Sequence, residues 1–172
     1  MTVIDAATAM KLATALAAGP TELFAVLSGL FTGIPGVRTA TFIATAPDKS
    51  VTHRIGTSNP VDFPVGNVDP VGDDVWNNTI LGAMRPVIGD SVAGMAAFLP
   101  ETEGLVAMGY GACSCFPIVI AGETRGVVAL LGDAGIFTPA TLARIDTLLP
   151  IAALTFTFEG ISKLPDRGSG LP

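Results

Sequence analysis

Two cysteines, Cys113 and Cys115, flank one serine and are the residues of this sequence best suited to covalent chemistry. A thiol pair facing a cavity would sense oxidants, trap an electrophile or act as a nucleophile. The neighbouring residues are apolar and include no Lys or His that would lower a thiol pKa. Two small hydrophobic side chains on a buried strand are the other interpretation, and we favour it.

Neither a disulfide nor a metal site is expected at the cysteines. Residues i and i+2 of a regular strand lie about 6.8 Å apart, near the upper limit of disulfide geometry. The cysteines and His53, the single histidine, give three ligands, whereas a closed zinc site needs four. Asp62, Asp69 or a second subunit would have to supply the fourth. We predict that His53 is a solvated strand residue rather than a general base or a haem ligand.

The single tryptophan and the single tyrosine are candidate pocket residues. Trp76 would either stack on a flat ligand or pack a helix against a sheet. Tyr110, between two glycines, would donate a hydrogen bond into a pocket or cover its edge. The acidic cluster Asp69, Asp73 and Asp74 could bind a cation, but a solvated loop is the simpler interpretation.

Length and composition predict one domain, residues 1–159, followed by a flexible tail, residues 160–172. The 172 residues are 49% hydrophobic and 14% charged, which is enough for a core without disulfides or metals. The net charge is −6 and the basic residues are scattered. Nucleic acids and anionic membrane surfaces require clustered positive charge, so we expect neither as a partner.

The apolar segments predict a cytoplasmic protein. No apolar run approaches the ~20 residues of a membrane-spanning helix. Residues 6–18 resemble the core of a signal peptide, but Asp5 stands where positive charge is expected and Lys11 interrupts the run. Two cysteines separated by one residue are not the framework of a secreted protein.

Hydrophobic periodicity predicts helices and then strands in the first part of the chain. Residues 4–18 are predicted to be helical, and a second helix follows Gly19–Pro20. The apolar residues of this second helix have the spacing of one buried face: Leu23, Val26, Leu27 and Leu30. Strands are predicted at 38–45 and 51–56, and residues 58–73, rich in Pro, Asp, Asn and Gly, are predicted to be a long loop.

The second half of the chain is predicted to end in a hairpin and a helix. Asp73 or Asp74 is expected to cap a short helix that ends near Leu81. The next predicted elements are a short strand within 85–91, helical pieces at 92–99 and 101–108, and strands at 110–120 and 126–132. The closing helix begins at Thr138–Pro139, and Pro150 is expected to kink or break it. Its predicted inner stripe is Leu142, Ile145, Leu149, Ala153 and Phe156. This order predicts an α+β domain with an antiparallel sheet.

Three blocks occur in a characteristic order: Arg85 to Ser91 (RPVIGDS), Cys113 to Ile118 (CSCFPI) and Gly126 to Leu130 (GVVAL). Together with Phe137-Thr-Pro139 before the last helix, they resemble the GAF domain family. This family is a sensory fold of phytochromes, cyclic-nucleotide phosphodiesterases and many bacterial regulators. The resemblance extends from the second helix to Phe158.

The resemblance implies a sheet of about six antiparallel strands, with the first two helices and the last on one face. The middle helices and the long loop would enclose a pocket on the other face. Cys113 and, by the period of two, Cys115 would point into this pocket from one strand. Ala129 and Leu131 would do so from the next strand.

The residues at these positions argue against the family's known chemistries. Free methionine sulfoxide reductases have acidic residues there, and bilin-binding members carry a Cys-His pair, whereas His53 is far from both cysteines. No residues were found to match cyclic-nucleotide recognition.

The resemblance therefore favours a small-molecule-binding or sensory domain with a mostly apolar pocket. We expect no cofactor, a ligand that touches Cys113, Cys115, Ala129, Leu131, Trp76 and Tyr110, and a homodimer formed by the terminal helices. The signal would pass to a protein partner in trans or through a change in association. A small enzyme that uses Cys113 or Cys115, and a thiol redox sensor, are the alternatives.

Overall fold

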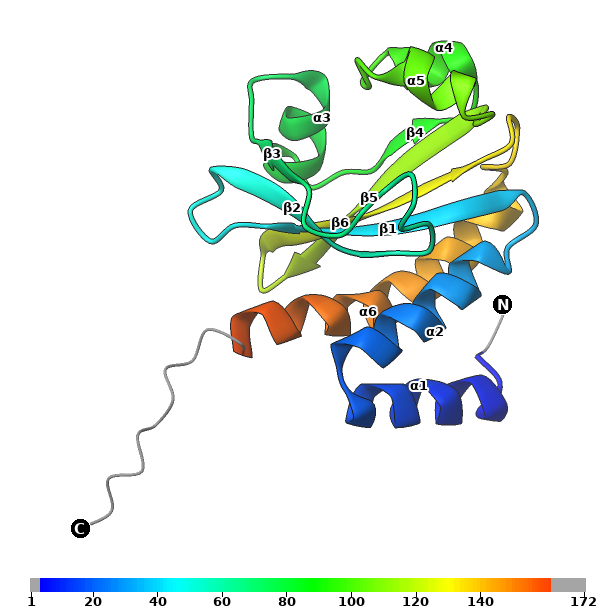
Figure 1. The fold of residues 1–172 in the computed structure, drawn as a ribbon, viewed down its shortest axis with the longest axis vertical. Helices are drawn as coiled ribbons and strands as arrows, with labels where there is room; N and C mark the ends of the chain where they lie inside the picture. Colours follow the sequence, from blue (N-terminus) through cyan, green and yellow to red (C-terminus); the bar gives the residue numbers. More distant parts are fainter. Residues whose placement is uncertain (1–3, 162–172) are drawn as a thin grey trace.

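The computed structural model describes residues 4–161 as three layers (Figure 1). Three helices lie on one face of a central sheet, and short helices and a long loop lie on the other face. The helices are α1 (Ala6–Ala18), α2 (Pro20–Thr32), α3 (Val75–Asn77), the π-helical turn η1 (Asn78–Gly82), α4 (Val92–Ala96), α5 (Thr102–Ala107) and α6 (Pro139–Ile161). The residues of the predicted tail beyond Ile161 lie outside the described part of the chain.

The sheet has six strands in the order β3-β2-β1-β6-β5-β4, and all neighbouring strands are antiparallel. The strands are β1 (Val37–Thr45), β2 (Val51–Thr57), β3 (Val68–Pro70), β4 (Val87–Gly89), β5 (Ala112–Ile120) and β6 (Glu123–Gly132). The α+β class, the strand number and the antiparallel arrangement are therefore confirmed. The central pairing of β1 with β6 joins the two ends of the domain.

Local sequence signals set most of the element ends. The Asp5 carboxylate accepts a hydrogen bond from the Thr8 amide at 2.7 Å and caps α1. Gly19, with φ 120°, ends α1, and Pro20 is the first residue of α2. Ala121 and Gly122 both have positive φ, as a two-residue hairpin turn between β5 and β6 requires.

Several elements differ from the sequence predictions, among them β6, which begins at Glu123 and not at Gly126. The predicted loop contains β3, a three-residue edge strand too short to show a period of two. Helix α4 ends at Ala96, before the predicted boundary at Leu99. Helix α6 continues through Pro150, so the predicted break is absent. Asp146 and Pro150 are both exposed, so water can solvate the carbonyl that loses its hydrogen bond.

The sheet separates two hydrophobic cores. The larger core lies between the sheet and α1, α2 and α6, and contains Phe42, Phe116 and Phe156. In α6, the buried positions are Ile145, Leu148, Ala152, Thr155 and Phe156, whereas Leu142, Leu149 and Ala153 of the predicted stripe are only partly buried. The smaller core lies on the other face and contains both cysteines.

Helix α6 also contains one segment with the length and composition of a membrane span. This segment is Pro139–Thr157, with 19 residues and a mean hydropathy of 1.2. The segment is not an uninterrupted apolar run, because Arg144 and Asp146 lie within it. In the fold, Ile145, Ala152 and Phe156 of this segment form part of the larger core.

Candidate ligand-binding site

A cavity of about 580 Å³ lies between the sheet and the layer of short helices. This volume is in the ~300–1,000 Å³ range of small-molecule sites. Strands β1, β2, β5 and β6 supply its floor, and α3, α5 and the segment between β2 and β3 supply its rim. The cavity is on the opposite face of the sheet from α1, α2 and α6.

One wall of the cavity is apolar and comes from β5 and β6. Cys113 lies opposite Leu131, and Cys115 lies opposite Ala129. All four residues line the cavity, because alternate residues of a strand point to the same face. Phe98 covers this wall from the α4–α5 connection. The structure therefore places these four predicted ligand contacts together, on the predicted face.

Trp76, on α3, also lines the cavity and is partly buried. The Asp74 carboxylate caps this short helix by accepting a hydrogen bond from the Asn77 amide at 2.8 Å. Of the two candidate caps, Asp74 is thus the one used.

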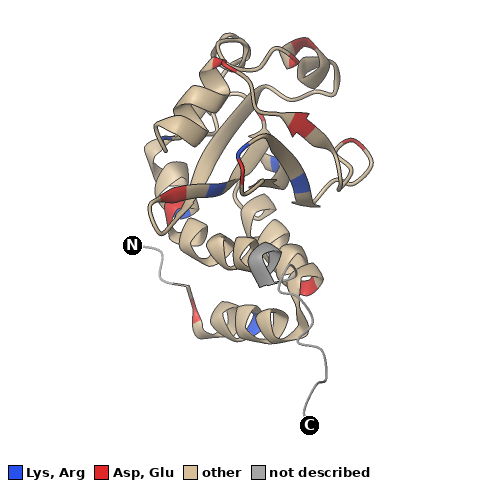
Figure 2. Cartoon of the chain, turned by 90° about the vertical axis from the view of Figure 1, so that its left-hand side faces the viewer, with Lys and Arg blue, Asp and Glu red and all other residues tan. Residues whose placement is uncertain are grey.

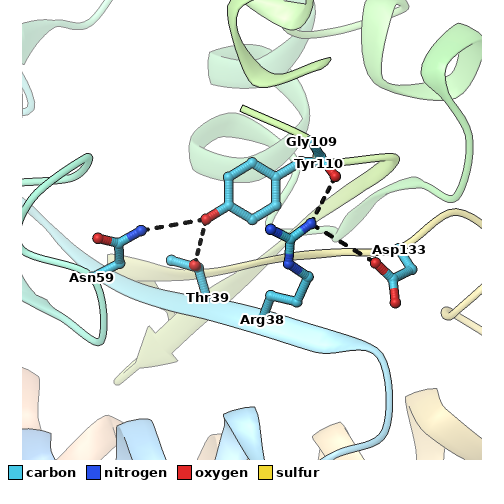
Figure 3. A network of polar contacts seen from close by, with 6 residues as sticks. All are labelled: Arg38, Thr39, Asn59, Gly109, Tyr110 and Asp133. Atoms are coloured by element: carbon cyan, nitrogen blue, oxygen red, sulfur yellow. Dashed lines mark hydrogen bonds and ion pairs between the residues drawn. The ribbon is translucent and has the colours of Figure 1, made fainter. Parts of the chain in front are cut away.

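Tyr110 lies in the smaller core beside the cavity, and its hydroxyl is engaged elsewhere. Its oxygen is 2.7 Å from the Thr39 hydroxyl and 3.4 Å from the Asn59 side-chain nitrogen (Figure 3). Buried tyrosine hydroxyls normally find such a partner. The predicted hydrogen bond from Tyr110 into the pocket is therefore not observed, and Tyr110 is not among the residues that line the cavity.

Two neighbouring aromatic rings, with an arginine at each end of the pair, hold the segment between β2 and β3 against the sheet. The Arg38 guanidinium lies 4.9 Å from the centre of the Tyr110 ring. The Tyr110 and Phe63 rings are 5.9 Å apart, and the Arg54 guanidinium lies 5.5 Å from the Phe63 ring. Arg38 also donates a hydrogen bond to the Gly109 carbonyl at 2.7 Å (Figure 3). Such contacts are attractive because ring faces are electron-rich.

The second wall of the cavity is polar, and the sequence analysis did not identify it. Thr41 of β1 and Thr52 and Arg54 of β2 line the cavity on this side. Four carboxylates also line it: Asp62, Asp69, Asp74 and Glu101. The alternation along residues 38–45 could have indicated that Thr41 shares a face with Ile43. It could not indicate that this face lines the pocket.

Several solved structures are similar to this chain over most of its length. The GAF domain of an Acinetobacter phosphoenolpyruvate-protein phosphotransferase superimposes with a TM-score of 0.70 at 9% identity, covering 95% of this chain and 100% of that one. The phycocyanobilin-bound GAF domain of a cyanobacterial phytochrome has a TM-score of 0.68 at 12% identity, with coverages of 95% and 98%. The GAF domain of a Bacillus halodurans two-component sensor histidine kinase has a TM-score of 0.65 at 13% identity, with coverages of 80% and 93%.

The chain has the GAF fold. No protein-family model matches the sequence, and no curated protein matches it. The fold is therefore established by the arrangement of strands and helices rather than by sequence identity.

Arg54 is a positively charged residue that lines the cavity. Not all of its N–H donors have a hydrogen-bond acceptor. One terminal nitrogen donates to the Pro64 carbonyl at 3.3 Å. The Nε atom is buried and has no hydrogen-bond partner among residues 4–161. Burial lowers the pKa of the guanidinium, and the nearby Asp69 carboxylate opposes this shift. A buried donor without an acceptor is costly.

The cysteines of this chain are poorly placed for nucleophilic chemistry in the geometry observed. Both are free and buried. The Cys115 thiol raises the pKa of the Cys113 thiol well above its usual value by hydrogen bonding, and burial raises it further. The Glu101 carboxylate adds a smaller repulsion in the same direction. Since the thiolate is the reactive form, a raised pKa argues against a nucleophile or a peroxide-sensitive thiol.

We expect both cysteines to react slowly with iodoacetamide in the folded protein. The rate of Cys113 should rise only above the usual thiol pKa, because folding favours the neutral form of this thiol. In denaturant, labelling should be at least about tenfold faster, since unfolding exposes both buried thiols and removes the raised pKa of Cys113. Mass spectrometry of samples quenched at intervals between pH 7 and 10 measures both rates. Rapid labelling of the native protein near pH 7 would contradict the geometry.

His53 and the cysteines are on opposite faces of the sheet. Residues 52 and 54 face the cavity, so the side chain of His53 points to the other side. His53 is partly buried, not solvated as predicted. Within residues 4–161, no group of three His, Cys, Asp or Glu side chains is placed to hold a metal ion.

Proposed function

We propose that this GAF-fold chain is a sensory module that binds a small organic molecule in the cavity between the sheet and the short helices. The observation that carries the proposal is the cavity itself, with one apolar wall, one polar wall and Trp76 at its rim. Ligand pockets commonly combine apolar walls with a few placed polar groups. The similar phytochrome GAF domain contains phycocyanobilin, and the similar histidine kinase carries its GAF domain as part of a sensor.

We further propose that the signal is transmitted by dimerisation, in which the layer formed by α1, α2 and α6 packs against the same layer of a second copy of the chain. Helix α1 packs against α2 and buries only Leu12 and Ala15. Met10 and Leu16 of α1 and Leu154 of α6 are exposed. Helices α1 and α2 contain one charged residue each, and Figure 2 shows that the helical layer carries few charges. An exposed apolar surface of this kind suits a second copy of the chain.

Native mass spectrometry of the protein purified from its own host tests both parts. We expect a dimer whose mass exceeds that of two chains by a small molecule, and loss of this molecule on denaturation. A monomer at all concentrations would contradict the pairing. An unliganded mass, together with no retained compound in an organic extract, would count against the ligand.

The alternatives, a cysteine-dependent enzyme and a thiol redox sensor, both require a reactive thiol in the cavity. Cys113 and Cys115 are in the cavity wall, as both alternatives require. The raised pKa of Cys113, however, opposes thiolate chemistry. We therefore favour binding over catalysis or thiol redox sensing.

A further inference from the structure

The polar wall of the cavity has a hydrogen-bond donor that the protein leaves unused. Thr41 and Thr52 are 2% and 5% exposed, and both line the cavity. Because both residues line the cavity, a ligand there can reach their hydroxyls. The Nε donor of Arg54 is buried and has no partner within residues 4–161. Most buried polar groups in proteins are paired, so the unpaired Nε of Arg54, on a wall with two threonines, indicates that a ligand pairs with it.

The strand register places these groups in a row. Arg54 lies opposite Ile43, which is two residues from Thr41 along β1. Thr52 is two residues from Arg54 along β2, on the same face. Arg54 is therefore the middle of the row, with one hydroxyl on each side. Since a guanidinium can only donate hydrogen bonds, the ligand must present an acceptor at this point.

The charges around the cavity limit what kind of acceptor fits. Four carboxylates and one guanidinium line it, so negative charge exceeds positive charge. Asp69 is close enough to Arg54 to affect its pKa. An anionic ligand would gain from Arg54 but would be repelled by Asp62, Asp69, Asp74 and Glu101. An uncharged carbonyl satisfies the Arg54 donor without that repulsion.

We infer that the ligand is an uncharged, amphipathic organic molecule whose amide, lactam, lactone or ketone oxygen accepts a hydrogen bond from Arg54. Its apolar body lies against Cys113, Ala129 and Leu131, on the adjoining strands β5 and β6. This inference rests on the proposed function, since it specifies the ligand of the same cavity. It disfavours phosphorylated ligands, which carry one or two negative charges.

A series of four probes with one apolar body tests the inference: phenylpropionamide, phenylpropionate, phenylpropylammonium and propylbenzene. Trp76 is the only tryptophan and lines the cavity, so its fluorescence reports binding, and shifts in ¹⁵N NMR spectra confirm the location. We expect the amide to bind at least about tenfold tighter than propylbenzene, as one hydrogen bond to a charged group provides. The carboxylate and the ammonium should bind more weakly than the amide.

Three variants assign the preference to the polar wall. Arg54→Met should reduce the preference for the amide over propylbenzene to about twofold or less, because the donor is lost. Arg125→Met is the matched control, since Arg125 is exposed, lies 3.2 Å from Glu123 and is outside the cavity. Thr41→Val keeps the shape of the side chain and removes one hydroxyl, so it should reduce the preference even if Arg54→Met does not fold.

Each outcome decides the inference. If phenylpropylammonium binds tightest, the carboxylates of the rim govern selectivity. If phenylpropionate binds tightest, pairing of its charge with Arg54 governs selectivity. Either result, or an unchanged preference in Arg54→Met or Thr41→Val, overturns the inference and leaves the cavity as a binding site. If no probe binds but native mass spectrometry finds a retained molecule, only the inferred ligand class is wrong. If neither is seen, the proposed function fails as well.

Discussion

Gly126→Ala is expected to lower the free energy of unfolding by about 3 kcal/mol or more, and Tm by roughly 6–12 °C. Gly126 lies in β6 beside Ala44 and Ile118, on the face that α6 covers. A Cβ at this position would contact the Phe156 ring and would lie 2.5 Å from the Ile43 carbonyl oxygen. The oxygen belongs to the backbone of a central strand and cannot move away cheaply. Thermal and chemical denaturation measure the loss.

Gly29→Ala is the matched control for this substitution. Gly29 is exposed inside α2, and a Cβ there would meet no atom within 4 Å. Alanine has the better helix propensity, so this variant should gain about 0.5–1 kcal/mol. A loss below about 1 kcal/mol for Gly126→Ala would show that α6 does not press on β6 as the structure has it.

Ala129→Phe is expected to reduce the affinity for a cavity ligand by at least about 100-fold while the domain stays folded. Ala129 lies between Thr41 and Cys115 on the cavity floor. The added ring would extend into the open volume of about 580 Å³ and occupy the place of the ligand. A loss of roughly 3 kcal/mol of binding corresponds to this factor. Because the ring enters empty space, the cost in stability should be below about 2 kcal/mol.

Titration of the retained ligand or of phenylpropionamide, followed by Trp76 fluorescence, measures the affinity of the Ala129→Phe variant. Ala140→Phe is the control, because Ala140 is exposed in the first turn of α6. It adds the same ring outside the cavity and should leave binding unchanged. Undiminished binding by a folded Ala129→Phe protein would show that the ligand is held elsewhere.

The local pattern of the sequence predicted most elements and one wall of the site. Alternation along β5 and β6 placed Cys113, Cys115, Ala129 and Leu131 on one face, and the resemblance to GAF domains indicated which face. Short elements were missed, because a three-residue strand such as β3 shows no measurable period. The sequence also did not predict that α6 continues through Pro150. Its continuation depends on whether the Asp146 carbonyl, which loses its hydrogen bond at the proline, is solvated by water.

The polar wall was decided only by tertiary structure. The sequence by itself determined that Thr52 and Arg54 share a face of one strand and that Tyr110 is followed by a buried hairpin. It did not determine that β1 pairs with β6, which lies about 90 residues later in the chain. That long-range pairing brings Thr41 beside Ala129, with Arg54 one strand further along the sheet, and forms one cavity from four strands. Side-chain period is a local property of each strand, whereas strand order depends on contacts between distant segments, so only the folded chain shows which faces meet.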